Sequence, residues 1–506
     1  VFDWSLEKYK QSLDFVLRHR RATLGATFAT LAVVIGLYAW VPKGFFPIED
    51  TGFISGTIEA ATDTSFEAMA ERQREVAAIV RKDKDVAYVV SIAGATGISR
   101  TTNTGRLFVS LKPRHQRTES ANQIIQRLRG TVAQVAGVKA FFQPVQNISI
   151  GGTSARALYQ YTLQSSDTDA LYTVAPQMLD RIAQIGMLRD VNSDLQITNP
   201  QLTIDVDSDK ARALGIGDDQ IRSVLYSQYG SRQVATLYTS TNQFQVIVEV
   251  QRRFQRDETD LSRTYLRAST GQLVPLDAIA TVRRTVGPLQ ISHQQQQPSV
   301  TISFNLAPGV SLSEAVEAIQ RVERESNLPA SIASGFQGTA QAFRDSLSSQ
   351  PLLILAAVLV IYIVLGILYE SFIHPLTILS GLPSAGIGAL LTLLLFGMDL
   401  SVIAIIGIVM LVGIVKKNAI MMIDFAIERR RHGMGAQEAI REAALLRFRP
   451  IMMTTMAAIF GTLPIAIGAG EGAELRQPLG VAVVGGLLLS QLLTLYITPV
   501  IYMYLD

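Results

Sequence analysis

The sequence predicts a polytopic α-helical membrane protein with six transmembrane helices and a large α+β domain outside the membrane. The first observation is a set of apolar segments, each long enough to cross a hydrocarbon core of about 30 Å. The second is the stretch from Pro42 to about Arg344, which is polar and alternates strand-like and helix-like patterns. With 48% hydrophobic residues over 506 positions, the chain is too apolar for an ordinary soluble enzyme. With 17% charged residues, it is too polar for a membrane protein made of a helical bundle alone.

Residues 1–21 carry the pattern of an amphipathic helix. Apolar side chains recur at helical spacing from Phe2 to Leu17, and the pattern ends in the basic run Arg18-His19-Arg20-Arg21. We expect this helix to lie on a membrane face with its basic end anchored there.

Six segments have the length and apolarity of a spanning helix. They are Ala22–Val41, Pro351–Tyr369, Pro375–Phe396, Leu400–Ile427, Pro450–Ala469 and Leu479–Met503. Basic clusters precede the first span and lie between the fourth and the fifth, four crossings apart, so the positive-inside rule places both in the cytoplasm. The region after the first span, residues 22–41, then lies on the other side of the membrane, and residues 338–506 hold the remaining five spans.

The outer region contains a repeat of β-α-β units. A strand at Phe53–Ala60, a polar turn and a helix to about Lys84 recur in the same order from Leu158–Leu163 onward. Two further units lie at Arg106–Gln143 and Val300–Phe336. Such units predict two ferredoxin-like subdomains, at residues 42–156 and at residues 157–207 with 299–337. Residues 208–298 form a polar insertion with no pattern for a closed core of its own.

Two lysines, Lys416 and Lys417, lie inside the apolar span Leu400–Ile427. A charged side chain near the bilayer centre costs about 2.5–3.5 kcal/mol even on the mildest scale. Because charged groups in such positions mark ion or proton pathways, the pair favours a transporter.

Other classes of function are disfavoured. The net charge is only +3, and no lysine- or arginine-rich tract predicts a nucleic-acid surface. The five histidines are scattered, and no nucleophile elbow, phosphate loop or zinc spacing occurs, so we expect neither an enzyme nor a bound cofactor. Without cysteine, the chain has no disulfide and no thiolate metal site.

Several long motifs resemble those of resistance-nodulation-division (RND) efflux pumps. The segments GIVKKNAIMMIDFA and RFRPIMMTT resemble the tenth and eleventh membrane helices of these pumps. The segments NPQLTIDVDSDKARALGI and VPKGFFPIEDTG resemble the hydrophobe/amphiphile branch, and the opening FDWSLEKYKQSLDFVLRHRRAT resembles the MdtB/MuxB kind of multidrug transporter. The family repeats one unit twice, so the resemblance implies that this chain is the C-terminal half. Its outer region would then be a periplasmic porter domain, with the insertion as its docking part.

The resemblance assigns a proton relay to the fourth and fifth spans. Lys417 corresponds to the lysine that stands opposite two aspartates of the fourth helix, and Arg447 and Thr454 correspond to supporting residues. Asn418, directly after Lys417, is the fourth predicted relay residue. Protons would be the coupling ion, with no cofactor. The aspartates are absent here, which implies an N-terminal half as a partner. Lys416 is rotated about 100° from Lys417, and we expect it to extend toward the cytoplasmic end of the helix.

The resemblance also implies a substrate pocket in the porter domain. Phe108 and Arg100 match family positions, whereas the other aromatic positions are small or aliphatic. The resemblance places Tyr159 and Tyr161 at the entrance of the substrate cleft, where the family often has phenylalanine, although each could be an ordinary strand residue. Phe141 and the phenylalanine after it alternate on a strand, so at most one of them faces the pocket and the other is core.

Two functions remain open. One is drug/proton antiport in the bacterial inner membrane, by a homotrimer or by a heterotrimer with a paralogous subunit, together with a periplasmic adaptor and an outer-membrane channel. The other is a structural or proton-coupling subunit of a heterotrimer in which the paralogue binds the drug, because the pocket lacks aromatic residues. A heavy-metal exporter of the same superfamily would need methionine clusters, and Met69, Met178 and Met187 are dispersed.

Overall fold

The computed structural model describes residues 2–94, 101–152, 155–255 and 257–505. The chain divides into two compact units, one made of Val1–Asp194 with Ser292–Asp506 and the other of Leu195–Ile291. The first contains a helical bundle and two α/β subdomains, and the second contains most of the predicted insertion.

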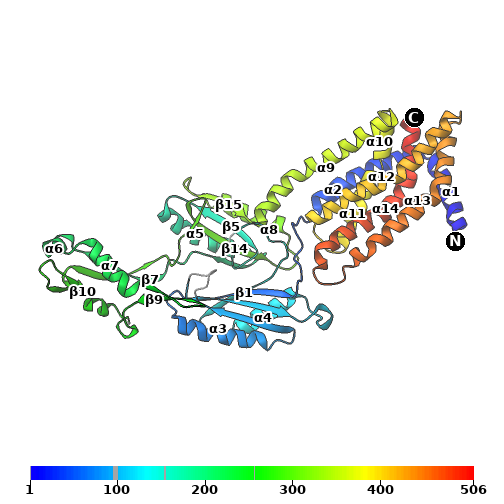
Figure 1. The fold of residues 1–506 in the computed structure, drawn as a ribbon. Helices are drawn as coiled ribbons and strands as arrows, with labels where there is room; N and C mark the ends of the chain where they lie inside the picture. The colour runs from blue at the N-terminus through cyan, green and yellow to red at the C-terminus, as the bar shows by residue number, and fades with distance from the viewer. Residues whose placement is uncertain (1, 95–100, 153–154, 256, 506) are drawn as a thin grey trace. The chain divides into compact units, whose positions relative to one another are not determined.

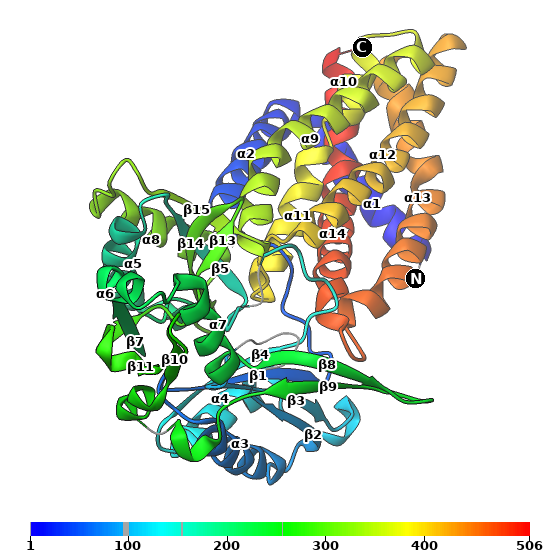
Figure 2. The ribbon, with the colours of Figure 1, turned by 60° about the vertical axis from the view of Figure 1, so that its left-hand side comes forward.

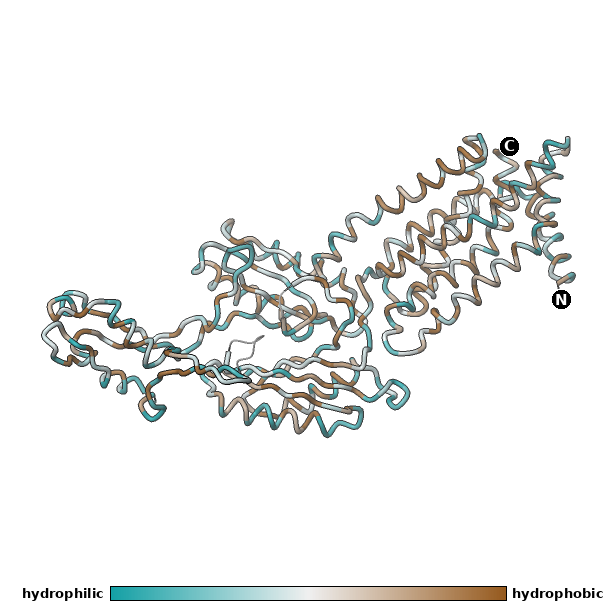
Figure 3. Tube along the Cα trace, in the orientation of Figure 1, coloured by the Kyte–Doolittle hydropathy of each residue, from teal (hydrophilic) through white to brown (hydrophobic). Residues whose placement is uncertain are grey.

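The bundle is made of long apolar helices that run side by side (Figure 1). They are α2 (Arg20–Trp40), α9 (Thr339–Tyr369), α10 (Ile373–Leu379), α11 (Leu382–Leu395), α12 (Val402–Arg431), α13 (Ala436–Ile467) and α14 (Ala473–Leu505). With α10 and α11 taken together, six helices of the described chain are long and apolar enough to cross a membrane. Most of their length is apolar, and brown in Figure 3. Each expected span falls on one of these helices, or on α10 together with α11, and extends no more than about two residues beyond it.

Two of these helices begin well before the expected spans. Two spans were predicted to begin at Pro351 and Pro450, but α9 and α13 run through these prolines as continuous helices. Before Pro450 the chain is rich in alanine, glutamate, leucine and arginine, which are good helix formers and extend α13 beyond the apolar window. The stretch before Pro351 is rich in serine and is helical without such a preference. Hydropathy therefore located the apolar part of each helix rather than its first turn.

Helix α14 is the most buried helix of the bundle. Two-thirds (67%) of its apolar window is buried, against none of the window of α2. Small residues allow this close packing: a Cβ on Gly388 of α11 would lie 2.4 Å from the carbonyl oxygen of Gly485, and one on Gly486 would lie 2.0 Å from Leu411 of α12. A side chain at either position would push the helices apart.

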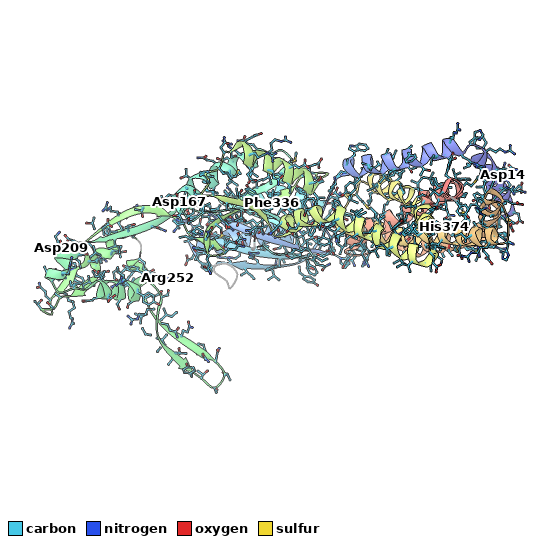
Figure 4. The ribbon with its side chains drawn as sticks, turned by 90° about the horizontal axis from the view of Figure 1, so that it is seen from above. Asp14, Asp167, Asp209, Arg252, Phe336 and His374 are labelled. Carbon is cyan, nitrogen blue, oxygen red and sulfur yellow. The ribbon has the colours of Figure 1, made fainter. Side chains whose placement is uncertain are left out.

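Helix α1 (Phe2–Arg18) lies at one end of the bundle, where Asp14 is marked in Figure 4. Its apolar stripe, which includes Tyr9 and Leu13, is buried in a core shared with α13 and α14. The Tyr9 hydroxyl donates to the carbonyl of Leu495 at 3.0 Å, and Arg441 donates two hydrogen bonds to Asp14 at 2.6 and 2.9 Å. The stripe that predicted an amphipathic helix thus packs on the protein.

The first α/β subdomain follows α2. Its elements are β1 (Phe53–Ala60), α3 (Phe66–Arg81), β2 (Val86–Ala93), β3 (Thr104–Leu111), the short 3₁₀ helix η1 (Arg114–Gln116), α4 (Ala121–Val132) and β4 (Val138–Pro144). The four strands form an antiparallel sheet in the order β2-β3-β1-β4. Helices α3 and α4 cover one face of it (Figure 2). The buried side chains alternate along β1 and β3, as expected for a sheet with one covered face.

The second α/β subdomain has the same β-α-β-β-α-β element order along the chain, with the second unit inserted in the middle. Its elements are β5 (Tyr159–Gln164), α5 (Thr168–Ala183), β6 (Leu188–Ser193), β13 (Ser292–Gln294), β14 (Gln297–Leu306), α8 (Leu312–Glu325) and β15 (Ala333–Gln337). Strand β14 lies between β5 and β6, and β15 pairs with the other edge of β5. The predicted strand at Leu158–Leu163 and the unit at Val300–Phe336 are therefore present within a few residues.

The unit Leu195–Ile291 has a core of its own. Its elements are β7 (Asn199–Val206), α6 (Ser208–Ala213), α7 (Asp218–Tyr229), β8 (Arg232–Tyr238), β9 (Gln243–Val248), η2 (Arg252–Phe254), η3 (Glu258–Arg263), β10 (Tyr265–Arg267), β11 (Leu273–Pro275), η4 (Leu276–Ala278) and β12 (Ala280–Gly287). Ile216, Ile221, Leu266 and Leu276 are among its buried residues. The expectation of no closed core was wrong because these residues come from short elements, none of which is periodic enough to show a buried face.

Candidate functional site

An open cavity of about 410 Å³ lies between α12 and α13. Its lining consists of small, apolar and polar side chains and one ammonium group: Met410, Gly413, Ile414, Lys417, Asn418, Thr454, Thr455 and Ala458. Three of the four predicted relay residues, Lys417, Asn418 and Thr454, line this one cavity.

The two lysines of α12 have opposite environments. Lys417 is exposed and lines the cavity. Lys416 is only 4% exposed, and its Nζ atom has no hydrogen-bond partner in the described part of the chain. The expected extension of Lys416 toward the cytoplasmic end is therefore not what the structure has. The rotation of about 100° per residue places Lys416 next to the buried arc of α12 that includes Ala419 and Ile423, so its side chain is enclosed.

Asn418 belongs to a buried hydrogen-bond network that joins three helices. Its Nδ2 donates to Oγ1 of Thr455 on α13 at 3.1 Å and to Oε1 of Gln491 on α14 at 3.2 Å. The Thr455 hydroxyl also donates to Oε1 of Gln491 at 2.7 Å. All three residues are buried. Thr454, the residue before Thr455, donates instead to the carbonyl of Ile451 in its own helix.

Thr455 and Gln491 were not among the residues predicted from the sequence. Gln491 carried a usable signal, because a buried amide in a spanning helix is costly unless it finds a hydrogen-bond partner. Which partner it finds depends on how α12, α13 and α14 pack, and the sequence alone does not give that.

Arg447 is separate from the cavity lining. Its guanidinium lies 5.1 Å from the ring centre of Phe425, and that of Arg429 lies 4.9 Å from the same ring. Both arginines thus make cation–π contacts with one phenylalanine. The Nε atom of Arg447 is buried and has no hydrogen-bond partner among the described residues.

The predicted substrate residues of the first subdomain lie on the face of its sheet opposite α3 and α4. Phe108 is 41% exposed and stands between Val90 of β2 and Ser55 of β1. Phe141 is partly exposed, whereas Phe142 is buried in the core, as their alternation predicted. Exposed apolar side chains of β2 extend this face. Arg100 lies outside the described residues.

Tyr159 and Tyr161 are packing residues of the second subdomain. Tyr161 is fully buried against Phe336, which is marked in Figure 4, and Tyr159 is buried in a stacked contact with Phe304. The predicted position of both rings at a cleft entrance is therefore wrong for this structure, and their alternative role as ordinary strand residues holds. The physical reason is that β5 pairs with β14 on one side and β15 on the other, and the two rings pack against Phe304 and Phe336 of these strands.

The methionines considered as metal ligands in the outer region lie in different elements. Met69 is buried in the core of the first subdomain, and Met178 is buried on α5 of the second. Within the described ranges, no group of three or more histidine, aspartate or glutamate side chains is placed to hold a metal ion.

Comparisons with known proteins agree with this architecture. The sequence model of the AcrB/AcrD/AcrF family matches residues 1–506. Two crystal forms of a heavy metal efflux pump have the same fold: form II at 23% identity and a TM-score of 0.88, and form I at 24% identity and a TM-score of 0.87. The matches cover 100% and 99% of this chain but 53% and 51% of the pump chains. The chain thus spans about half the length of these structures.

Proposed function

Because the chain belongs to the AcrB/AcrD/AcrF family of RND transporters, we propose that it is the second half of a proton-driven efflux pump of the hydrophobe/amphiphile branch. The pump would lie in the inner membrane of a bacterium, with the two α/β subdomains and the Leu195–Ile291 unit in the periplasm. The observation that carries the proposal is the position of Lys417, an ammonium group at an open cavity in an apolar helix bundle.

The cavity supplies one half of a proton-coupling site. It contributes the ammonium of Lys417, an amide and two hydroxyls, but none of its lining residues is acidic. An ammonium in such a place binds tightly to deprotonated carboxylates and is released when they take up protons, since the attraction between opposite charges is strong away from water. The carboxylates would come from an N-terminal half that packs over this cavity. Proton uptake would then change how the two halves pack.

The free sheet face around Phe108 would contribute to the substrate pocket. Aromatic and aliphatic side chains lie beside polar ones there: Phe108, Tyr88 and Val90 are exposed, and Arg106 and Ser110 are partly exposed on the same strand as Phe108. Such a surface suits amphiphilic molecules, for example bile-salt-like detergents or acidic antibiotics. The heavy metal efflux pump solved in two crystal forms shares only 23–24% identity with this chain, and the described residues of this chain hold no group of three or more histidine, aspartate or glutamate side chains placed to bind a metal.

A second candidate is a proton-coupling subunit of a heterotrimer in which a paralogue binds the drug. The burial of Tyr159 and Tyr161 favours it, because these rings cannot contact substrate where they lie. In either case we propose a trimer that works with a periplasmic adaptor and an outer-membrane channel.

The test is a susceptibility profile in a bacterial strain that lacks its own efflux pumps. The complete pump should raise tolerance to bile-salt-like detergents, and Lys417→Ala should remove that tolerance while leaving the amount of protein in the membrane unchanged. Tolerance to copper, silver or zinc salts without tolerance to amphiphiles would contradict the proposed substrate class. If a paralogous subunit must be present for any tolerance, the second candidate is favoured.

A further inference from the structure

The buried network of Asn418, Thr455 and Gln491 sits directly behind the cavity. Asn418 and Thr455 line the cavity, whereas Gln491 does not. Gln491 lies behind them on α14, the most buried helix of the bundle, and its Oε1 accepts hydrogen bonds from both. Oε1 of Gln491 therefore accepts hydrogen bonds from two residues of the cavity lining, one on α12 and one on α13.

The orientation of the Gln491 amide follows from a third hydrogen bond of its side chain. Its Nε2 donates to the thioether sulfur of Met452 at 3.3 Å. A thioether is a weak acceptor and never a donor, so it pairs with the amide nitrogen and not with the amide oxygen. With Nε2 directed at Met452, Oε1 must point toward Asn418 and Thr455.

This orientation in turn fixes the Asn418 amide. Two acceptors, Thr455 Oγ1 and Gln491 Oε1, lie within 3.1 and 3.2 Å of its Nδ2. A flipped amide would place its own oxygen against Gln491 Oε1, and two acceptors repel each other. Asn418 is thus held with both N–H groups directed inward, and its Oδ1 is left to accept a hydrogen bond from a group in the cavity.

We propose that Gln491 is a positioning residue of the proton relay: it holds Asn418 so that Oδ1 accepts a hydrogen bond from the Lys417 ammonium when that ammonium is released by protonated carboxylates. The inference rests on the proposed function. In the released state the ammonium loses its ionic partners and needs a neutral acceptor inside the membrane. Asn418 Oδ1 and the Thr454 hydroxyl belong to residues that line the same cavity as Lys417, and in the network Asn418 uses only its Nδ2 while Thr454 acts as a donor. Gln491 would therefore stabilise the protonated state of the relay.

The charged groups around this site are few. Lys417 is the one titratable residue among those that line the cavity. Asp424 lies seven residues farther along α12, and Arg447 lies seven residues before Thr454 on α13, each about two turns away. Lys416 is buried on another side of α12.

The test replaces Gln491 by methionine in the complete pump and measures amphiphile transport as a function of pH. Gln491→Met keeps an unbranched side chain of similar length but removes the oxygen that orients Asn418. We expect transport to fall about tenfold, the effect of losing a buried hydrogen bond, and the pH of half-maximal transport to move about one unit lower. The matched control is Ser490→Ala, because Ser490 is also buried on α14 but its hydroxyl donates to Leu487 in its own helix. The control should keep the wild-type pH profile.

A double-mutant cycle separates positioning from a general structural role. If Gln491 acts through Asn418, Gln491→Met should change transport less than about twofold in a pump that already carries Asn418→Ala. Equal effects in both backgrounds, an unshifted pH profile, or the same shift in Ser490→Ala would overturn the inference. If Gln491→Met does not reach the membrane, Met452→Leu replaces it: loss of the sulfur acceptor frees the Gln491 amide to rotate and should shift the profile in the same direction.

The outcome for Lys417→Ala distinguishes this inference from the proposed function. Normal transport by Lys417→Ala would reject the proposed function itself. Loss of transport in Lys417→Ala together with wild-type behaviour of Gln491→Met would reject only the role of Gln491.

Discussion

The buried ion pair between Asp50 and Arg117 should control the stability of the first α/β subdomain. Both side chains are buried, and the guanidinium makes two hydrogen bonds to the carboxylate, at 2.5 and 2.7 Å. The same carboxylate accepts from the backbone N–H of Ala121 at 2.9 Å and of Gly52 at 3.2 Å, so it joins the segment after α2 to the first residue of α4. The hydrogen bonds that Asp50 accepts therefore hold these two segments together.

Replacement of Asp50 by asparagine would leave the Arg117 charge buried without its partner. Breaking a buried pair in this way costs roughly 3–5 kcal/mol. Asp50→Leu combined with Arg117→Met removes both charges and should cost less than either single change, because no unpaired charge remains. We expect Asp50→Asn to lower the unfolding temperature of the purified protein in detergent and to speed amide hydrogen exchange in β1 and α4.

The effect should depend on pH in a defined direction. Burial alone would raise the pKa of Asp50, but the hydrogen bonds from Arg117 and Ala121 outweigh it and hold the pKa below its ordinary value. A carboxylate with a lowered pKa in the folded protein stabilises it above the unfolded pKa of about 3.9, and this stabilisation is lost as the pH falls through the lower folded value. The gap between wild type and Asp50→Asn should therefore be largest near neutral pH and shrink in acid. Equal stability of the two proteins at pH 7, or a double variant less stable than both single ones, would refute the reasoning.

Three further predictions concern other parts of the chain. Asp14→Ala removes both hydrogen bonds from Arg441 and should loosen α1, seen as faster proteolysis within α1; unchanged cleavage would show that the apolar stripe alone holds this helix. Phe108→Ala should reduce export of flat aromatic substrates only modestly, by about 0.5–1.5 kcal/mol of binding, since few aromatic rings share its face; complete loss of dye export would contradict this. Deletion of Leu195–Ile291, which has its own core, should leave the bundle inserted in the membrane yet prevent trimer or channel association, measured by cross-linking; undiminished cross-linking would argue against a docking role.

The sequence predicted elements whose pattern is local. The apolar spans, the alternating strand Phe53–Ala60 and the opposite orientations of Phe141 and Phe142 all follow from periodicity along one element, and the structure has them. The rotation between Lys416 and Lys417 was also predictable, because it depends on helix geometry alone.

Features that depend on packing between elements were missed. Tyr159 and Tyr161 were placed at a cleft, but the second sheet buries both. Lys416 was expected to reach the helix end, although its neighbours on α12 face the interior. The partners of Gln491 come from helices that lie 36 and 73 residues away in the sequence, a distance over which periodicity gives no information.

The central claim is that Lys417 couples proton movement to transport. The most direct measurement is proton flux in proteoliposomes that contain the complete pump, recorded with a pH-sensitive dye when an amphiphilic substrate is added. We predict that substrate-driven proton flux is present in the wild type, retained in Lys416→Met and abolished in Lys417→Ala. Wild-type flux in Lys417→Ala, with no other lysine at the cavity, would contradict the account.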